Sequence, residues 1–169
     1  MKISNLIFML LFQAFIFLVS SQNIEYGFKR VVEFHDKVLF EDVNMDIHKG
    51  PPKDSLGNPL SLYGIKFEAR DELMNLEKSI FSLEERKQIQ GYGHRAGLAF
   101  FTIEAATGNI VCVSFIFRNI DESFSINVKK LAKYREEIKK NIRYHYLSFE
   151  GGGSPISGYF RQVMPVFID

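Results

Sequence analysis

The chain has no tryptophan and only one cysteine, Cys112, among its 169 residues. One cysteine cannot form an intramolecular disulfide, so an apolar core has to hold the fold even in an oxidising compartment. Cys112 lies within an apolar run and has no histidine near it in the sequence. This setting is typical of a packed, unreactive thiol; a nucleophilic thiol or an intermolecular disulfide is the alternative.

The chain also lacks an excess of either charge, with 21 basic and 20 acidic residues. Proteins that bind nucleic acids in bulk rely on many uncompensated lysines and arginines, which displace counterions from the phosphates. The even balance argues against nucleic acid as a partner.

Only one stretch is long and predominantly apolar, from Ile3 to Val19, and it follows the basic Lys2. The small residues Ser20-Ser21 behind it suit signal peptidase, so we predict a cleaved signal peptide over residues 1–21. An uncleaved membrane anchor is the alternative, although the run is short for a spanning helix. After cleavage we expect one exported domain over residues 22–169, periplasmic or extracellular and without an integral membrane span.

Two runs rich in β-branched and aromatic residues predict an antiparallel hairpin. They are Leu98–Ala106 and Ile110–Arg118, joined by Thr107-Gly108-Asn109, where glycine and asparagine tolerate the positive φ of a short turn. Because side chains alternate along a strand, the second run has two faces, of which we expect the first to be core. The first face holds Val111, Val113, Phe115 and Phe117, and the second holds Cys112, Ser114, Ile116 and Arg118.

An amphipathic helix is predicted over residues 126–142, with Ser125 as its N-cap. Its apolar residues recur at spacings of three and four, which places them in one stripe that can pack on a sheet. The stripe consists of Leu131, Tyr134, Ile138 and Ile142.

The chain is predicted to close with a strand over Gly158–Ile168, after a glycine-rich loop at 150–155. Pro165 lies inside this strand and has no N–H to donate to a sheet. We therefore expect an edge strand, or one that is bulged at the proline.

The N-terminal half contains shorter signals of the same kinds. A capping box at Ser82 and Glu85 predicts the start of a helix that stops near Gly91. The other predicted elements are strands in Tyr26–Phe34 and Lys37–Phe40, a loop over Lys49–Pro59, a strand over Leu62–Arg70 and a helix over Asp71–Lys78. Together these elements predict an α+β fold, in which a small antiparallel sheet carries the long helix on one face.

No metal or cofactor site is expected from the sequence. Asp42-Val-Asn-Met-Asp46 imitates the start of a calcium loop, but Ile47 and Lys53 stand where that loop needs glycine and a carboxylate. The four histidines are too scattered for a metal-binding helix.

The segment Gly91-Tyr-Gly-His-Arg95 leaves two interpretations open. A glycine pair that presents Tyr92, His94 and Arg95 has the groups to bind an anion, which would suit an envelope hydrolase with its site near His94 and Arg95. The alternative is a plain linker before the hairpin.

The long helix is rich in basic residues, with only Glu136 and Glu137 among them. Such a run usually forms a solvated face, and the alternative is a docking surface for anionic lipid head groups or an acidic protein. The basic residues are Lys129, Lys130, Lys133, Arg135, Lys139 and Lys140, with Arg143 just beyond.

The order of elements from about residue 100 to 168 resembles the C-terminal domain of TonB-type proteins. The resemblance consists of the turn at Gly108, Ile110-Val-Cys-Val113, the helix, Arg143-Tyr144 and a closing Met164-Pro-Val-Phe167 strand. It implies a helix packed on a small antiparallel sheet, in a domain that engages the periplasmic segment of outer-membrane receptors.

We therefore expect a non-enzymatic cell-envelope binding or accessory protein, working through a sheet edge to which a partner strand adds. The hydrolase near His94 and Arg95 is the alternative, and the sequence leaves the oligomeric state open. The candidate partner-binding residues are Tyr159, Arg161 and Val163 on the last strand and Lys133 and Lys140 on the helix.

Overall fold

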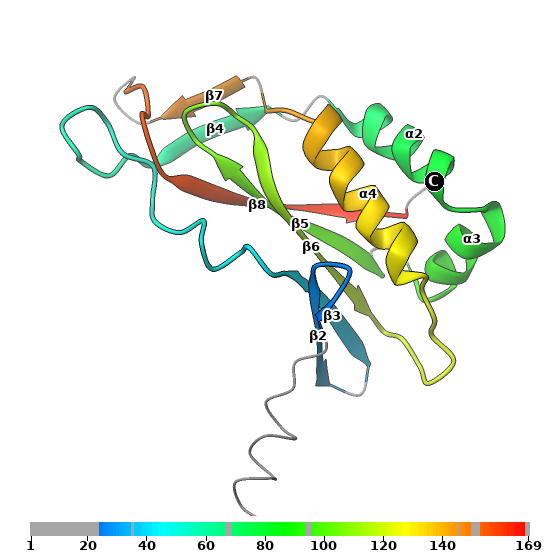
Figure 1. Cartoon of the computed structure of the whole chain (residues 1–169). Helices are drawn as coiled ribbons and strands as arrows, with labels where there is room; N and C mark the ends of the chain where they lie inside the picture. Colours follow the sequence, from blue (N-terminus) through cyan, green and yellow to red (C-terminus); the bar gives the residue numbers. More distant parts are fainter. Residues whose placement is uncertain are drawn as a thin grey trace, which may run out of the picture.

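A computed structural model describes residues 24–34, 36–66, 69–93, 96–144, 146–149 and 153–167. The predicted α+β class is confirmed: a six-stranded antiparallel sheet carries helices on one face (Figure 1). The strands lie side by side in the order β1 (Ile24–Glu25), β2 (Phe28–Phe34), β3 (Lys37–Asp42), β6 (Ile110–Arg118), β5 (Gly97–Glu104) and β8 (Tyr159–Val166).

The helices and a second, two-stranded sheet complete the described fold. The helices are α2 (Arg70–Ile80), α3 (Leu83–Gly91) and α4 (Val128–Asn141), and the second sheet pairs β4 (Leu62–Lys66) with β7 (Tyr146–Phe149). Two predictions need correction here, because the strand expected over Leu62–Arg70 already ends at Lys66 and Arg70 begins α2. β7 was not predicted at all, since four residues carry too little periodicity to be recognised.

The predicted hairpin is confirmed as β5 and β6, which occupy the centre of the large sheet. Gly108 in the turn has a φ of +73°, in the left-handed region that glycine enters without strain. Thr107 supports the same turn, since its hydroxyl donates to Glu104 at 2.6 Å and accepts from the Asn109 amide at 3.2 Å.

The expected core face of β6 packs against α4. Val113, Phe115 and Phe117 are fully buried as predicted, while Val111 is only half-buried. Their partners on α4 are the predicted stripe residues, and Tyr134 stacks on Phe115 with ring centroids 5.8 Å apart. The stripe residues Leu131, Tyr134, Ile138 and Ile142 are all fully buried.

The second face of β6 is also covered, which the alternating pattern did not indicate. Cys112, Ser114 and Ile116 are buried, and only Arg118 is exposed. Part of the cover is the segment after β3, where the Ser114 hydroxyl reaches Met45 Sδ at 3.9 Å. Burial and the nearby Asp42 carboxylate raise the pKa of the Cys112 thiol to about 12, in keeping with a packed thiol.

The helix α4 begins two residues later than the predicted 126, and its N-cap is Asn127 instead of Ser125. The Asn127 side chain accepts from the Lys130 amide at 3.1 Å and so satisfies one of the amides that a helix start leaves without a partner. Ser125 is exposed and lies too far before the helix to reach that amide.

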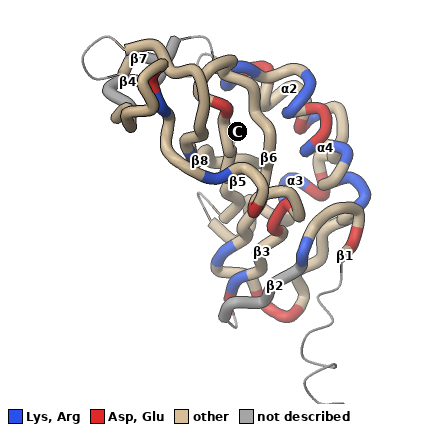
Figure 2. The backbone as a smooth tube through the Cα atoms, turned by 60° about the vertical axis from the view of Figure 1, so that its left-hand side comes forward, with Lys and Arg blue, Asp and Glu red and all other residues tan. Residues whose placement is uncertain are grey.

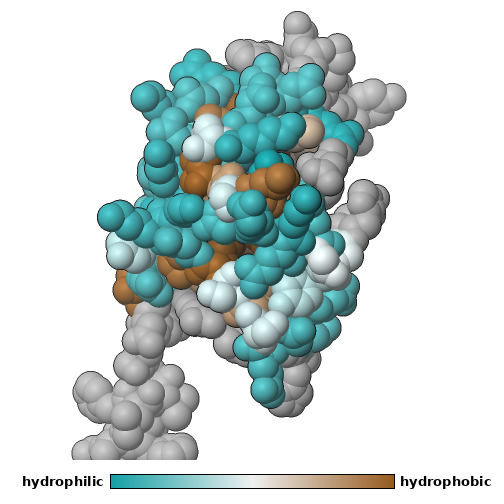
Figure 3. Space-filling model, turned by 90° about the vertical axis from the view of Figure 1, so that its right-hand side faces the viewer, coloured by the Kyte–Doolittle hydropathy of each residue, from teal (hydrophilic) through white to brown (hydrophobic). Residues whose placement is uncertain are grey.

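The predicted capping box is present at the start of α3. The Ser82 hydroxyl accepts from the Glu85 amide at 3.2 Å, and Glu85 accepts from the Ser82 amide at 2.7 Å. Lys130 on α4 joins the same carboxylate at 2.7 Å, so one acidic side chain connects α3 to α4. Outside these contacts the helical side of the molecule is mostly hydrophilic, with apolar groups in a band across its middle (Figure 3).

We expect Glu85→Gln to lower stability at neutral pH and to remove part of the acid sensitivity. The hydrogen bond from Lys130, followed by that from the Ser82 amide, holds the pKa of Glu85 below its ordinary value. A lowered folded-state pKa stabilises the protein above the unfolded value of about 4.3, and this contribution disappears as the pH falls through the folded value. Urea unfolding at pH 7 and pH 3 checks this: the variant should differ from wild type at pH 7 and approach it at pH 3. An equal difference at both pH values would contradict the assignment.

Candidate functional site

The last strand, β8, is the edge of the large sheet, as its proline predicted. Within the described part of the chain it pairs with β5 alone. The Ala105 amide donates to the Gly158 carbonyl at 2.9 Å, and the register pairs Glu104 with Tyr159. In an antiparallel ladder, hydrogen-bonded and non-bonded residue pairs alternate. Even-numbered residues of β8 therefore bond to β5, and the backbone groups of the odd-numbered residues point outward.

This alternation places Pro165 at an outward position, where its missing N–H costs the ladder no bond. The strand consequently runs through the proline without a register shift. The prediction left open whether β8 would be an edge or bulged, and the register decides for a regular edge.

Both ends of the outer edge are occupied by other parts of the chain. The outward amide of Tyr159 donates to the Gly50 carbonyl at 3.0 Å. At the other end, the outward amide of Phe167 donates to the buried Glu77 carboxylate at 2.6 Å. Between them, the outward amides of Arg161 and Val163 have no partner among the residues that the structure describes, and Val163 is 43% exposed.

The structure brings together three of the five candidate partner-binding residues. Tyr159, Arg161 and Val163 alternate along β8 and share the face of the sheet opposite to α4. Lys133 and Lys140 are exposed on α4, which covers the other face. One flat partner cannot contact both groups at once, so β8 is the better-defined candidate site.

The basic residues of α4 do not form a uniform cationic surface. Lys130 pairs with Glu85 at 2.7 Å and Lys139 pairs with Glu136 at 3.7 Å. Figure 2 shows acidic and basic residues interspersed along the helices. The arrangement fits a solvated helix face better than a dedicated surface for anionic lipids.

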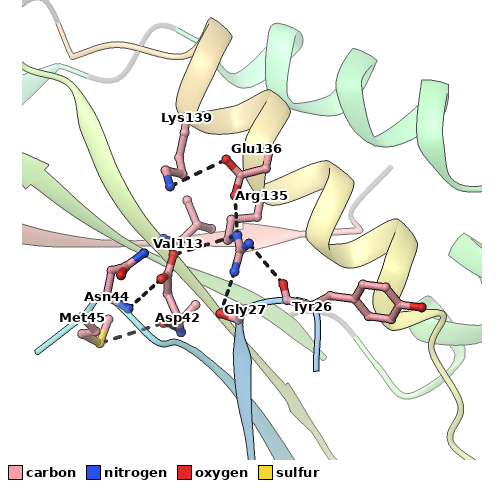
Figure 4. Close-up of polar contacts among 10 residues, drawn as sticks. Tyr26, Gly27, Asp42, Asn44, Met45, Val113, Arg135, Glu136 and Lys139 are labelled. Carbon is pink, nitrogen blue, oxygen red and sulfur yellow. Dashed lines mark hydrogen bonds and ion pairs between the residues drawn. The ribbon is translucent and has the colours of Figure 1, made fainter. Parts of the chain in front are cut away.

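Arg135, which the sequence grouped with these surface cations, is mostly buried and structural. Its guanidinium donates to the carbonyls of Gly27 at 2.8 Å and Tyr26 at 3.2 Å (Figure 4). It also lies 4.4 Å over the ring of Phe28. Its Nε also lies 3.9 Å from the buried carboxylate of Asp42. Arg135 thus fastens α4 to the turn between β1 and β2, and it is not available to a partner.

Of the other candidate site residues, Asp42 is engaged in hydrogen bonds within the fold, whereas His94 and Arg95 lie outside the described residues. Asp42, the first residue of the calcium-like stretch, accepts from the Asn44 and Val113 amides at 3.0 and 3.4 Å. No group of three or more metal-binding side chains occurs in the described ranges. His94 and Arg95, with the predicted hydrolase site, lie outside the described residues, as does the predicted signal peptide.

Comparisons with known proteins provide a fold and no function. No family model matches the chain, and no curated protein matches it. A solved structure of a DUF5043 family protein from Bacteroides uniformis is similar over 82% of this chain and 79% of its own, with a TM-score of 0.55 and 12% identity. At this identity the likeness shows the fold alone. The comparisons give no support to the TonB resemblance.

None of the helices in the described ranges is long and apolar enough to span a bilayer.

Proposed function

We propose that this protein is an exported, non-enzymatic binding or accessory protein of the cell envelope, which takes up an extended segment of a partner protein at the outer edge of β8. The observation that carries the proposal is the open stretch at Arg161 and Val163, between two ends that the chain itself occupies. Strand addition to an exposed sheet edge is a common mode of peptide recognition.

The edge offers a short and well-defined docking length. Arg161 and Val163 each present one outward N–H and one outward C=O, so an added strand forms up to four backbone hydrogen bonds. Each bond contributes about 0.5–1.5 kcal/mol net, which makes the backbone part of the interaction modest. Arg161 and Pro165 limit promiscuous edge-to-edge pairing, since charge and proline on an edge are common protections against it. A partner therefore needs matching side chains besides its backbone.

We expect Val163→Pro to weaken capture of the partner while the protein stays folded. The substitution removes an outward N–H and leaves the β5 ladder intact. Val163→Thr is the matched control, because it keeps the N–H and a β-branched side chain. The measurement is pull-down from an envelope extract with quantitative mass spectrometry, alongside the melting temperature of each variant. We expect wild type and Val163→Thr to capture the partner equally well, and capture by Val163→Pro to fall by up to about tenfold, the effect of one hydrogen bond.

Gln162→Pro is a second variant, which disrupts the hydrogen bonds between β5 and β8 instead of the outward groups of the edge. Gln162 pairs inward with Phe101, so proline there removes a β5–β8 hydrogen bond and should lower the melting temperature. Undiminished capture by a folded Val163→Pro protein would contradict strand addition at this edge.

A further inference from the structure

The face of the sheet opposite to the helices contains a pocket that the proposed strand addition does not use. Its volume is about 360 Å³, near the lower end of the range for small-molecule sites. One wall is formed by β5 and β8 and the other by the segment 48–51 between β3 and β4. The side chains that matter here are His48, Lys49, Pro51, Thr102, Tyr159 and Arg161.

The segment over the pocket is firmly attached to β8. Gly50 accepts from the Tyr159 amide at 3.0 Å, and the rings of His48 and Tyr159 meet edge to face at 5.1 Å. Gly158 permits this close approach, because a Cβ there would lie 2.1 Å from the Pro51 carbonyl oxygen. The wall formed by the segment 48–51 is therefore fixed to β8 by backbone contacts.

Thr102 is the feature that points to a ligand. Its side chain is 0% exposed, it lines the pocket, and its hydroxyl has no hydrogen-bond partner in the described structure. An unpaired buried hydroxyl costs about 1–3 kcal/mol, which valine at this strand position would avoid. His48 adds a second such group, since its Nδ1 is buried and has no hydrogen-bond partner among the described residues.

The charges around the pocket indicate that its ligand is an anion. The register pairs Thr102 with Arg161 on β8 as a non-hydrogen-bonded pair, which places their Cα atoms about 4.5 Å apart and their side chains on the same face. Lys49 stands at the rim, where Asp46 pairs with it at 2.8 Å. Among the described residues no acidic side chain lines the pocket, so Arg161 is its principal charge. A guanidinium matches the planar, two-oxygen shape of a carboxylate.

We propose that this pocket binds a small organic carboxylate. The carboxylate pairs with the Arg161 guanidinium and accepts a hydrogen bond from the Thr102 hydroxyl. The apolar body of the ligand packs on Pro51 and the ring of Tyr159. The pocket and the proposed β8 edge share Arg161, but the pocket uses its side chain, whereas strand addition uses its outward backbone groups.

The test is a titration of the isotope-labelled protein with benzoate, followed by the chemical shifts of its backbone amides. We expect benzoate to shift the amides of Lys49, Gly50, Thr102 and Arg161, and neutral benzamide to leave them in place. Thr102→Val should weaken benzoate binding about five- to tenfold, the effect of one hydrogen bond, and Arg161→Gln should weaken it at least as much. Arg118→Gln, which removes an exposed arginine at the end of β6, is the matched control and should bind like wild type.

Stability distinguishes a ligand-binding role of Thr102 from a structural one. Thr102→Val should melt at or above the wild-type temperature, because the variant buries no unpaired hydroxyl. A Thr102→Val variant that binds benzoate more weakly and melts at or above the wild-type temperature supports the site. Benzoate shifts that fall elsewhere, unchanged affinity in both pocket variants, or binding of inorganic phosphate in place of benzoate would overturn the proposal.

Discussion

Truncation of Phe115 to alanine should cost about 3–5 kcal/mol of unfolding free energy. The side chain is 0% exposed and lies at the centre of an aromatic cluster between the sheet and α4. Its ring meets Phe28 edge to face at 6.0 Å and stacks on Tyr134 at 5.8 Å. Alanine would leave a cavity that these rings cannot fill without losing their contacts with each other, so both the transfer energy and the packing energy are lost.

The matched control for this variant is Phe100→Ala. Phe100 lies on the neighbouring strand β5, on the opposite face of the sheet, and is half-buried. Its truncation should cost about 1–2 kcal/mol, since part of its apolar surface is already in contact with water. Urea denaturation of both variants provides the comparison. Equal losses, or a loss below about 1 kcal/mol for Phe115→Ala, would contradict the assignment of the core face.

Replacement of Gly108 by alanine should destabilise the protein by about 2–5 kcal/mol. Two costs add up at this position. The residue has a φ of +73°, where a Cβ costs about 1–2 kcal/mol. In addition, the new Cβ would lie 2.0 Å from the carbonyl oxygen of Tyr144, which is backbone and cannot rotate away, so overpacking adds about 1–3 kcal/mol.

Gly57→Ala separates these two costs. Gly57 has a similar φ of +83°, but a Cβ there meets no atom within 4 Å. We expect it to show the conformational cost alone, about 1–2 kcal/mol. The difference between the two variants in chemical denaturation then measures the close approach of the hairpin turn to Tyr144. If both glycines cost the same, that approach does not constrain the folded protein.

The same turn shows what the sequence alone predicts and what it does not. Glycine and asparagine between two apolar runs were enough to predict the hairpin, because the φ requirement of a short turn is a local property. The capping box at Ser82 and the stripe from Leu131 to Ile142 were predicted for the same reason, since spacing within one segment determines them. The amide of Tyr144, however, donates to the Gly108 carbonyl at 3.0 Å, and nothing in either segment indicated that they meet.

Two of the wrong predictions depend on distant neighbours. Ser114 was placed on the face away from the core, yet it is buried and the segment after β3 helps to cover it. Arg135 was counted as a surface cation, yet the turn at Gly27 and the ring of Phe28 enclose its guanidinium. Alternation within a strand or helix defines its faces, but only the packing of other segments decides what each face meets.

The candidate site follows the same division. The sequence by itself restricted the strand with Pro165 to a sheet edge or a bulge, because proline has no N–H to donate. Only the tertiary structure decided which amides of β8 point outward, since this depends on the register with β5. It likewise decided that Thr102, an ordinary strand residue by sequence, faces Arg161 inside a pocket closed by the segment 48–51. Local composition specifies the elements, whereas the open edge and the unpaired hydroxyl arise from contacts between segments about 50 residues or more apart.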